Sequence, residues 1–126
     1  MEFSESESVK NALFDELELL YLMGGNRDDV DALLEASFAE AQEKMATICS
    51  GIEKDDFESI QKAAMSLQGD AATIKSAMLS IIAARTAKIA KKKDIDEVIC
   101  SVQELDSALK SLKSHLKSNG WLQKPN

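Results

Sequence analysis

The segment DIDEVICSVQELDSALKSLKSHLKS, residues 94–118, decides the fold class. Its apolar residues recur at intervals of three and four without interruption, which is the spacing of one face of an α-helix. Asp94 is a suitable N-cap, and Asn119-Gly120 provides an end signal. The apolar stripe consists of Ile95, Val98, Val102, Leu105, Leu109, Leu112 and Leu116. A helix over about 95–118 with such a stripe is expected to pack against other helices at shallow angles.

The same periodicity predicts four further helices. An N-terminal helix over about 5–23, with Leu17 and Leu22 in its apolar stripe, ends at Gly24-Gly25. The others are expected over about 27–50, where Gly51 ends the pattern, over about 56–73, and over about 76–92 after a short break at Lys75-Ser76.

Short connections force neighbouring helices to run antiparallel, so the segment of about 27–118 is predicted to form an up-down four-helix bundle. The helix over about 5–23 is expected to cover one end. The tail, 119–126, is expected either to be loose or to dock through Trp121. Composition agrees with a single all-α domain over 1–126. With 44% hydrophobic and 29% charged residues but one proline and five glycines, the chain has little from which to build the turns of a β fold.

Charge is unevenly distributed. The 15 Lys and Arg residues against 22 Asp and Glu give a net charge of −7, which disfavours general binding to nucleic acid. Residues 1–35 are strongly acidic, with ten carboxylates against Lys10 and Arg27. Five cations cluster later in the chain, at Arg85, Lys88, Lys91, Lys92 and Lys93. We expect this cluster to be a solvated helix face, the alternative being a patch for a partner.

The cysteines and the N-terminus suggest an intracellular protein without a cofactor. Cys49 and Cys100 lie in predicted helices, have no CxxC spacing, and are expected to be buried free thiols, so neither a zinc site nor a redox motif is indicated. No stretch approaches the ~18 apolar residues of a membrane span, and Met1 to Lys10 lack an apolar leader core. We therefore expect a cytoplasmic monomer that does not bind membranes.

Gly69 is the one glycine that lies inside a periodic run. A glycine there lowers helix stability by about 1 kcal/mol relative to alanine, which indicates that the absence of a side chain is needed at this position. At helical spacing, Gly69 lies opposite Ile60 and therefore faces solvent. The same outer face holds Met65, Gln68, Gln61, Lys62, Glu58 and Ala72. This combination predicts a shallow spot for a partner's backbone, the alternative being a scattered surface methionine beside a tolerated glycine.

Residues 63–79, AAMSLQGDAATIKSAML, resemble the signature of histidine-containing phosphotransfer (HPt) domains, A-H-x-L-K-G-x-A-x-x-[IL]-G-A-x-x-L. Positions that match in register include Leu67, Gly69, Ala71, Ile74 and Leu79. Leu22 to Asn26 is similar to the family's start of its second helix, and Lys93-Asp94 to the step before its last helix. The resemblance covers about 10–117 and implies an antiparallel four-helix bundle with the signature on an outer helix face.

The departures from the family fall where its chemistry takes place. The resemblance aligns Met65 with the phosphoacceptor histidine, and a thioether cannot be phosphorylated. Gln68 replaces the usual lysine and supplies no positive charge. Lys75 replaces a glycine, and Asp70 adds a carboxylate that is expected to point aside. The only histidine, His115, has no matching motif and is expected to be structural and partly exposed.

The resemblance therefore implies a non-catalytic, HPt-like signalling protein. Such a protein would dock receiver domains or histidine kinases of a two-component phosphorelay through the two helices over 27–50 and 56–73, around Met65 and Gly69, as an inhibitor or scaffold. One alternative is a helical adaptor that has drifted from the family and binds an unrelated partner through the acidic N-terminal helix or the 85–93 cations. Another is a true HPt protein with an engineered acceptor site, which the changes at Gln68 and Lys75 disfavour.

Overall fold

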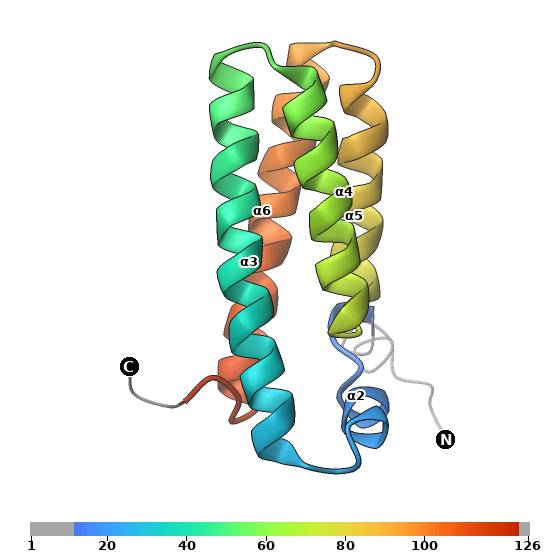
Figure 1. The fold of residues 1–126 in the computed structure, drawn as a ribbon, viewed down its shortest axis with the longest axis vertical. Coiled ribbons are helices and arrows are strands. Elements are labelled where there is room, and N and C mark those ends of the chain that lie inside the picture. Colours follow the sequence, from blue (N-terminus) through green and yellow to red (C-terminus); the bar gives the residue numbers. More distant parts are fainter. Residues whose placement is uncertain (1–11, 124–126) are drawn as a thin grey trace, which may run out of the picture.

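The computed structural model describes residues 12–123, which form helices joined by turns (Figure 1). The helices are α2 (Glu16–Leu22), α3 (Arg27–Glu53), α4 (Phe57–Thr73), α5 (Ala77–Ala90) and α6 (Ile95–Ser118). No strand occurs between residues 12 and 123. Helices α3 to α6 run alternately in opposite directions and pack side by side, with α2 at one end (Figure 1). The predicted all-α antiparallel bundle with an additional N-terminal helix is confirmed.

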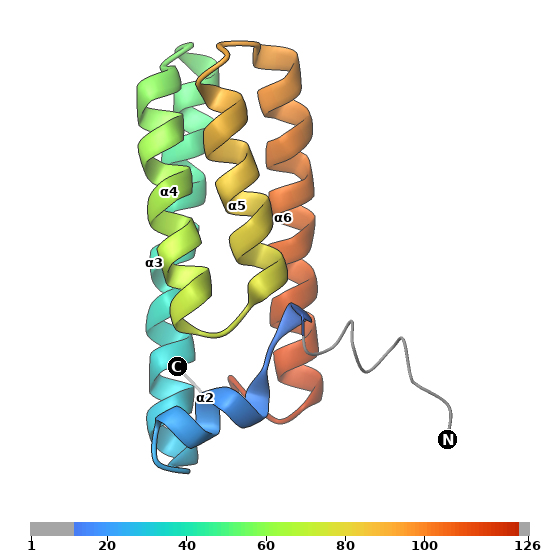
Figure 2. The same cartoon turned by 90° about the vertical axis from the view of Figure 1, so that its right-hand side faces the viewer.

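The bundle helices differ in length, and this difference makes room for α2. Helix α3 has 27 residues and α6 has 24, whereas α4 has 17 and α5 has 14. At about 1.5 Å of rise per residue, α3 is about 20 Å longer than α5. Helices α3 and α6 therefore extend past the turn between α4 and α5, and α2 lies below that turn (Figure 2).

The turns before α3, α4, α5 and α6 are built alike. In each, the residue before the N-cap has a positive φ, and the N-cap side chain accepts a hydrogen bond from a backbone N–H of the first helical turn. The four pairs are Gly25 and Asn26, Asp55 and Asp56, Lys75 and Ser76, and Lys93 and Asp94. A left-handed residue reverses the chain and the cap satisfies an N–H group that the helix leaves without a partner. The predicted break at Lys75-Ser76 is confirmed.

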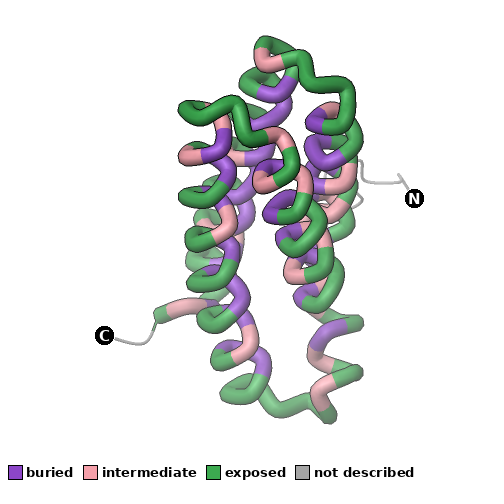
Figure 3. Tube along the Cα trace, turned by 45° about the horizontal axis from the view of Figure 1, so that its top comes forward, coloured by how far each residue is buried: buried purple, intermediate pink, exposed green. Residues whose placement is uncertain are grey.

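Side chains that face the bundle axis form an aliphatic core, and Figure 3 shows buried and exposed turns alternating along each helix. In α6, six of the seven predicted stripe residues are buried, and Ile95 is half-buried. One polar pair lies within the core, where the hydroxyls of Thr86 and Ser101 are 2.6 Å apart. Thr86 Oγ1 also donates to the carbonyl of Ile82 at 2.9 Å, so both hydroxyls are satisfied despite their burial.

Trp121 closes the end of the bundle next to α2. Its side chain is 1% exposed, and its Nε1 donates a hydrogen bond of 2.6 Å to Glu16 Oε1. The indole lies edge-on to Phe14 with 6.5 Å between ring centroids, and the Arg27 guanidinium stands 4.0 Å from the ring centroid. Of the two expectations for the tail, docking through Trp121 is therefore the one found for residues 119–123.

The prediction of one continuous N-terminal helix over about 5–23 is wrong at Phe14 and Asp15, where the helix is interrupted. Its first part, residues 5–11, lies outside the described residues. Asp15 is the N-cap of α2, since its Oδ1 accepts from the N–H of Glu18 at 3.2 Å. The N–H of Asp15 donates to the carbonyl of Lys75 at 2.9 Å, which ties the interruption to the turn between α4 and α5.

The interruption changes which leucines of α2 face the core. Leu17 and Leu22 belong to the predicted apolar stripe, but they are 79% and 57% exposed. Leu19, which the pattern leaves out, is buried in their place. A helix that starts at Glu16 no longer continues the rotation of the residues before it, so the periodicity read across Phe14 has the wrong phase for α2.

Two further predictions from the sequence are wrong. Cys49 and Cys100 are free, as expected, but both are exposed because each lies on the outward side of its helix. Gly51 does not end a helix, since α3 continues to Glu53. A Cβ at Gly51 would lie 2.7 Å from Ile60 Cγ1, so the glycine lets α4 approach α3 closely.

Candidate functional site

The seven residues predicted as a docking surface lie together on the outer side of α4. We call them the α4 face: Glu58, Gln61, Lys62, Met65, Gln68, Gly69 and Ala72. Met65 is 54% exposed, and no atom lies within 4 Å of the position that a Cβ on Gly69 would take. Gln61 and Gln68 are half-buried, and the remaining members are exposed. The helix therefore presents a thioether and a gap in the side-chain layer one turn apart, as the sequence predicts.

Charges on the α4 face are balanced. Lys62 Nζ lies 3.0 Å from Glu58 Oε1, and both side chains are about three-quarters exposed. An exposed pair at this spacing contributes little to stability, about 0.5 kcal/mol or less. Next to this neutral pair, the centre of the face is formed by Met65, Gly69 and Ala72, which present apolar or backbone surface to a partner.

The two edges of α4 point to different neighbours. Asp70 lies on the edge that faces α3, where Glu40 and Lys44 act on its carboxyl group. Gln68 lies on the other edge, where its carbonyl accepts from Ser80 Oγ of α5 at 3.4 Å. At helical spacing, Met65 lies on the same side of α4 as Gln68. Met65 therefore lies nearer the α5 edge of α4, whereas Gly69 lies midway between the two edges. The part of the helix over 27–50 in the expected docking surface stays a prediction.

One exposed apolar residue of α5 was missed in the sequence. Ile81 is 64% exposed and lies on the outer side of α5. A signal for it was present, because the buried residues Leu79, Ile82, Ala83 and Thr86 place Ile81 on the opposite side of the helix at helical spacing.

Asp70 is a carboxyl group held between two helices. Its Oδ2 is buried and has no hydrogen-bond partner among residues 12–123. Burial and, to a smaller extent, the neighbouring Glu40 raise the pKa of Asp70, against the opposing effect of Lys44, to about 6. The expectation that Asp70 points aside from the α4 face is confirmed by its position against α3. The buried carboxyl oxygen without a partner therefore lies at the α3–α4 contact and not on the exposed surface.

The chain's histidine and the expected acceptor position lie on different helices. His115 is half-buried near the end of α6, where the side chain of Asn119 lies 3.3 Å from the ring nitrogens. Its environment is that of a helix end, which matches the expectation of a partly exposed structural histidine. Met65 lies in the middle of α4, whereas His115 lies in the last turn of α6.

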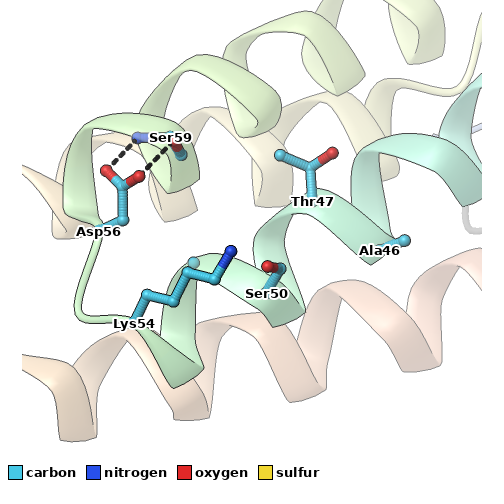
Figure 4. Close-up of a pocket in the computed structure, with 7 residues that line it drawn as sticks. Ala46, Thr47, Ser50, Lys54, Asp56 and Ser59 are labelled. Carbon is cyan, nitrogen blue, oxygen red and sulfur yellow. Dashed lines mark hydrogen bonds between the residues drawn. The ribbon is translucent and has the colours of Figure 1, made fainter.

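A shallow pocket of about 320 Å³ lies where α3 ends and α4 begins (Figure 4). Asp56 Oδ1 accepts from the N–H of Ser59 at 3.1 Å, and Oδ2 accepts from Ser59 Oγ at 2.7 Å. These hydrogen bonds lower the pKa of Asp56 below its ordinary value. Both carboxylate oxygens thus accept hydrogen bonds at the start of α4, and Lys54 and Ser50 line the same pocket (Figure 4).

The cluster of five cations is divided between two environments. Arg85 forms a bond of 2.6 Å with Glu104 across α5 and α6, and Lys92 lies 3.8 Å from Glu97. Lys88, Lys91 and Lys93 are exposed. All five side chains are exposed, as expected, but only Arg85 and Lys88 lie on α5, whereas Lys91, Lys92 and Lys93 lie in the turn that follows it.

No family model, no curated protein and no solved structure matches this chain significantly. Within residues 12–123, no three His, Cys, Asp or Glu side chains are grouped so that they would hold a metal ion. No helix of the described part is long and apolar enough to cross a membrane.

Proposed function

We propose that this chain is a non-catalytic, HPt-like signalling protein that docks receiver domains or histidine kinases of a two-component phosphorelay in the cytoplasm. Its mechanism is occupancy: the partner binds the α4 face, and phosphoryl transfer through genuine phosphotransfer proteins is blocked or scaffolded. Support comes from the antiparallel bundle and from the register of the sequence signature on an exposed side of α4.

The single observation that carries the proposal is the pairing of Met65 and Gly69. Met65 is 54% exposed, and Gly69 leaves open space where a side chain would stand. A glycine on an exposed helix face lowers helix stability by about 1 kcal/mol, which is accounted for if a partner's backbone approaches there. The signature requires these two positions four residues apart on one helix face, and α4 holds them so.

The residues around Met65 also fit a protein that does not accept phosphate. A thioether offers no nitrogen for phosphorylation, and Gln68 donates hydrogen bonds without the charge that would offset a phosphoryl group. Lys75 has φ 63°, a left-handed conformation suited to the glycine of the family signature. The backbone of the signature is thus compatible with the family while its acceptor chemistry is missing.

Docking is tested by substituting Gly69→Arg and measuring binding to receiver domains and histidine kinases of the source organism. The substitution fills the open space above α4, so affinity is expected to fall by several kcal/mol, since such interfaces depend on a small close-packed centre. The matched control is Ser111→Arg, which adds the same side chain at an exposed position on α6, away from the α4 face. Equal loss in both variants, or loss only on charge reversal of Lys91 to Lys93, would contradict the proposal.

Acceptor chemistry is tested by incubation with a phosphorylated receiver domain. The parent chain is expected to remain unlabelled, Met65→His to give weak transfer, and Met65→His with Gln68→Lys to give more, because the lysine stabilises the charge of the phosphoryl group in transfer. Acid-labile label on His115 of the parent chain would contradict the proposed absence of phosphate acceptance.

A further inference from the structure

A pocket of about 370 Å³ lies between the two long helices, α3 and α6. These helices run side by side, and the chain turns back toward α3 after α6 ends (Figure 1). The lining includes Glu35, Phe38 and Gln42 of α3, Lys113 and Lys117 of α6, and Leu122. We call this hollow the α3–α6 pocket. Its volume lies within the usual range of small-molecule sites, about 300–1,000 Å³.

The α6 side of the pocket carries two positive charges. Lys113 and Lys117 are four residues apart, so their side chains are neighbours on one side of the helix and repel each other. Neither forms an ion pair with a carboxylate of residues 12–123. A cation in the last turn offsets the partial negative charge of a helix end, which accounts for Lys117 but not for Lys113, one turn earlier. An anion in the pocket would offset both charges.

The α3 side limits how much negative charge the pocket can accept. Glu35 lines this side, so the two lysines and this one carboxylate give the lining a net charge of +1. That charge matches a monoanion, whereas a dianion would bring a second negative charge close to Glu35. Gln42 lies on the same side, and its amide group can donate a hydrogen bond to an anion without adding charge.

The apolar part of the lining is held in a fixed position. Phe38 is 6% exposed, so its ring belongs to the core and only a small part of it can reach the pocket. Leu122 has φ 58°, a left-handed conformation that costs free energy in a leucine. The N–H of Leu122 donates to Asp31 Oδ1 at 2.8 Å, which holds the residue in this conformation. Such strain persists where neighbouring groups fix the backbone, and it is frequent where a protein holds a ligand.

We propose that the α3–α6 pocket binds a small organic monocarboxylate. The carboxylate group would lie between Lys113 and Lys117, and the apolar body of the ligand would lie against Phe38 and Leu122. A neutral or cationic ligand would leave the two lysines without a counter-charge. No residue of α4 lines the pocket, so this inference is independent of the proposed docking of signalling domains.

The probe for the test is sodium hexanoate, added to the full chain at constant ionic strength and followed by NMR of the backbone and side-chain amides. A ligand of this size is expected to bind with a dissociation constant of about 1–10 mM. We expect saturable shifts confined to residues 35–42, 113–117 and 122. Hexylammonium, which has the opposite charge, should bind about tenfold more weakly or less tightly still.

Substituting Lys113→Gln together with Lys117→Gln should weaken hexanoate binding by about tenfold, because both charged donors to the carboxylate are lost. The matched control is Lys91→Gln with Lys93→Gln, which changes the net charge equally at exposed positions of the α5–α6 turn and should leave the affinity unchanged. Glu35→Gln should strengthen the binding of adipate, a dicarboxylate, more than that of hexanoate, because it removes the charge that opposes a dianion.

The proposal is overturned if hexanoate gives no saturable shifts at concentrations several times the expected dissociation constant. It is also overturned if the control variant loses as much affinity as the Lys113 and Lys117 variant, or if hexylammonium binds as tightly as hexanoate. Equal binding of inorganic phosphate would overturn it as well, since the apolar lining would then have no part in recognition.

Discussion

The end of the bundle closed by Trp121 and the outer side of α4 are organised in opposite ways. At the closed end, contacts join residues far apart in the chain: Trp121 to Glu16, and the N–H of Leu122 to Asp31 Oδ1 at 2.8 Å. On the α4 face, polar contacts are local: Lys62 pairs with Glu58 one turn away, and the carbonyl of Gln68 accepts from Ser80 of the next helix. The first region therefore joins distant parts of the chain, whereas the second contributes few contacts between them.

The largest expected effect on the free energy of unfolding comes from a substitution at the closed end of the bundle. Replacing Trp121→Ala removes a side chain that is 1% exposed, together with its contacts to Phe14, Glu16 and Arg27. A cavity of that size in a core lowers the free energy of unfolding by about 3–5 kcal/mol. Urea unfolding followed by circular dichroism measures this loss.

The control for that experiment is Met65→Ala on the α4 face, which should change the free energy of unfolding by about 0.5 kcal/mol or less. If Trp121→Ala costs no more than this control, the closed end does not couple α2 to the bundle, and the contrast between the two regions disappears.

The next largest effect concerns the close approach of α3 and α4. A Cβ on Gly51 would lie 2.7 Å from Ile60 Cγ1 and 3.1 Å from the carbonyl oxygen of Asp56. Gly51→Ala should therefore lower stability by about 1–3 kcal/mol through overpacking, despite the better helix propensity of alanine. The double variant Gly51→Ala with Ile60→Ala removes Cγ1, so its loss of stability should be smaller than the sum of the two single losses. An additive loss would mean that this contact is not the cause.

Most of the fold was predictable because its signals are local. The stripe of α6 and the glycines before Asn26 are each contained in a few residues, and the structure follows them. The interruption at Asp15 was missed because its strongest cause is the contact with Lys75, sixty residues later in the chain. A local signal was nevertheless present: Asp15 and Glu18 have the spacing of a helix start, three residues apart.

The candidate site was predictable only in part. Helical spacing was enough to expect Met65 and Gly69 on the outside of α4, and both are exposed. It was not enough to say which neighbouring helix each edge faces, because that depends on how the bundle is wound. Asp70 beside α3 and Gln68 beside α5 show which neighbour each edge of α4 faces.

A smaller effect on stability is expected from Asp70, which lies between the α4 face and the core. The pKa of Asp70 is raised to about 6, above the ordinary aspartate value of about 3.9 in the unfolded chain. The folded state therefore favours the protonated form, and stability falls as pH rises from about 4 to about 6. Because Asp70 is only half-buried, Asp70→Asn should raise the free energy of unfolding by about 1 kcal/mol at about pH 8.

That gain should vanish at about pH 4, where the parent carboxyl is protonated in the folded state. Urea unfolding at both pH values measures the difference, with Glu43→Gln on the exposed side of α3 as the control. An equal gain at both pH values would show that the charge of Asp70 is not what destabilises the α3–α4 contact.

The smallest expected effect is a gain in the free energy of unfolding, and it distinguishes Gly69 from Gly51, the other glycine inside a helix. Gly69→Ala meets no atom within 4 Å, and its φ is not positive, so only helix propensity changes. Alanine should raise the free energy of unfolding by about 0.5–1 kcal/mol, measured by the same urea titration that shows a loss for Gly51→Ala. A loss at Gly69 as well would mean that α4 needs this glycine for its own folding. A gain accompanied by weaker binding to receiver domains or kinases would show that the glycine is kept at the expense of stability because a partner requires the open space.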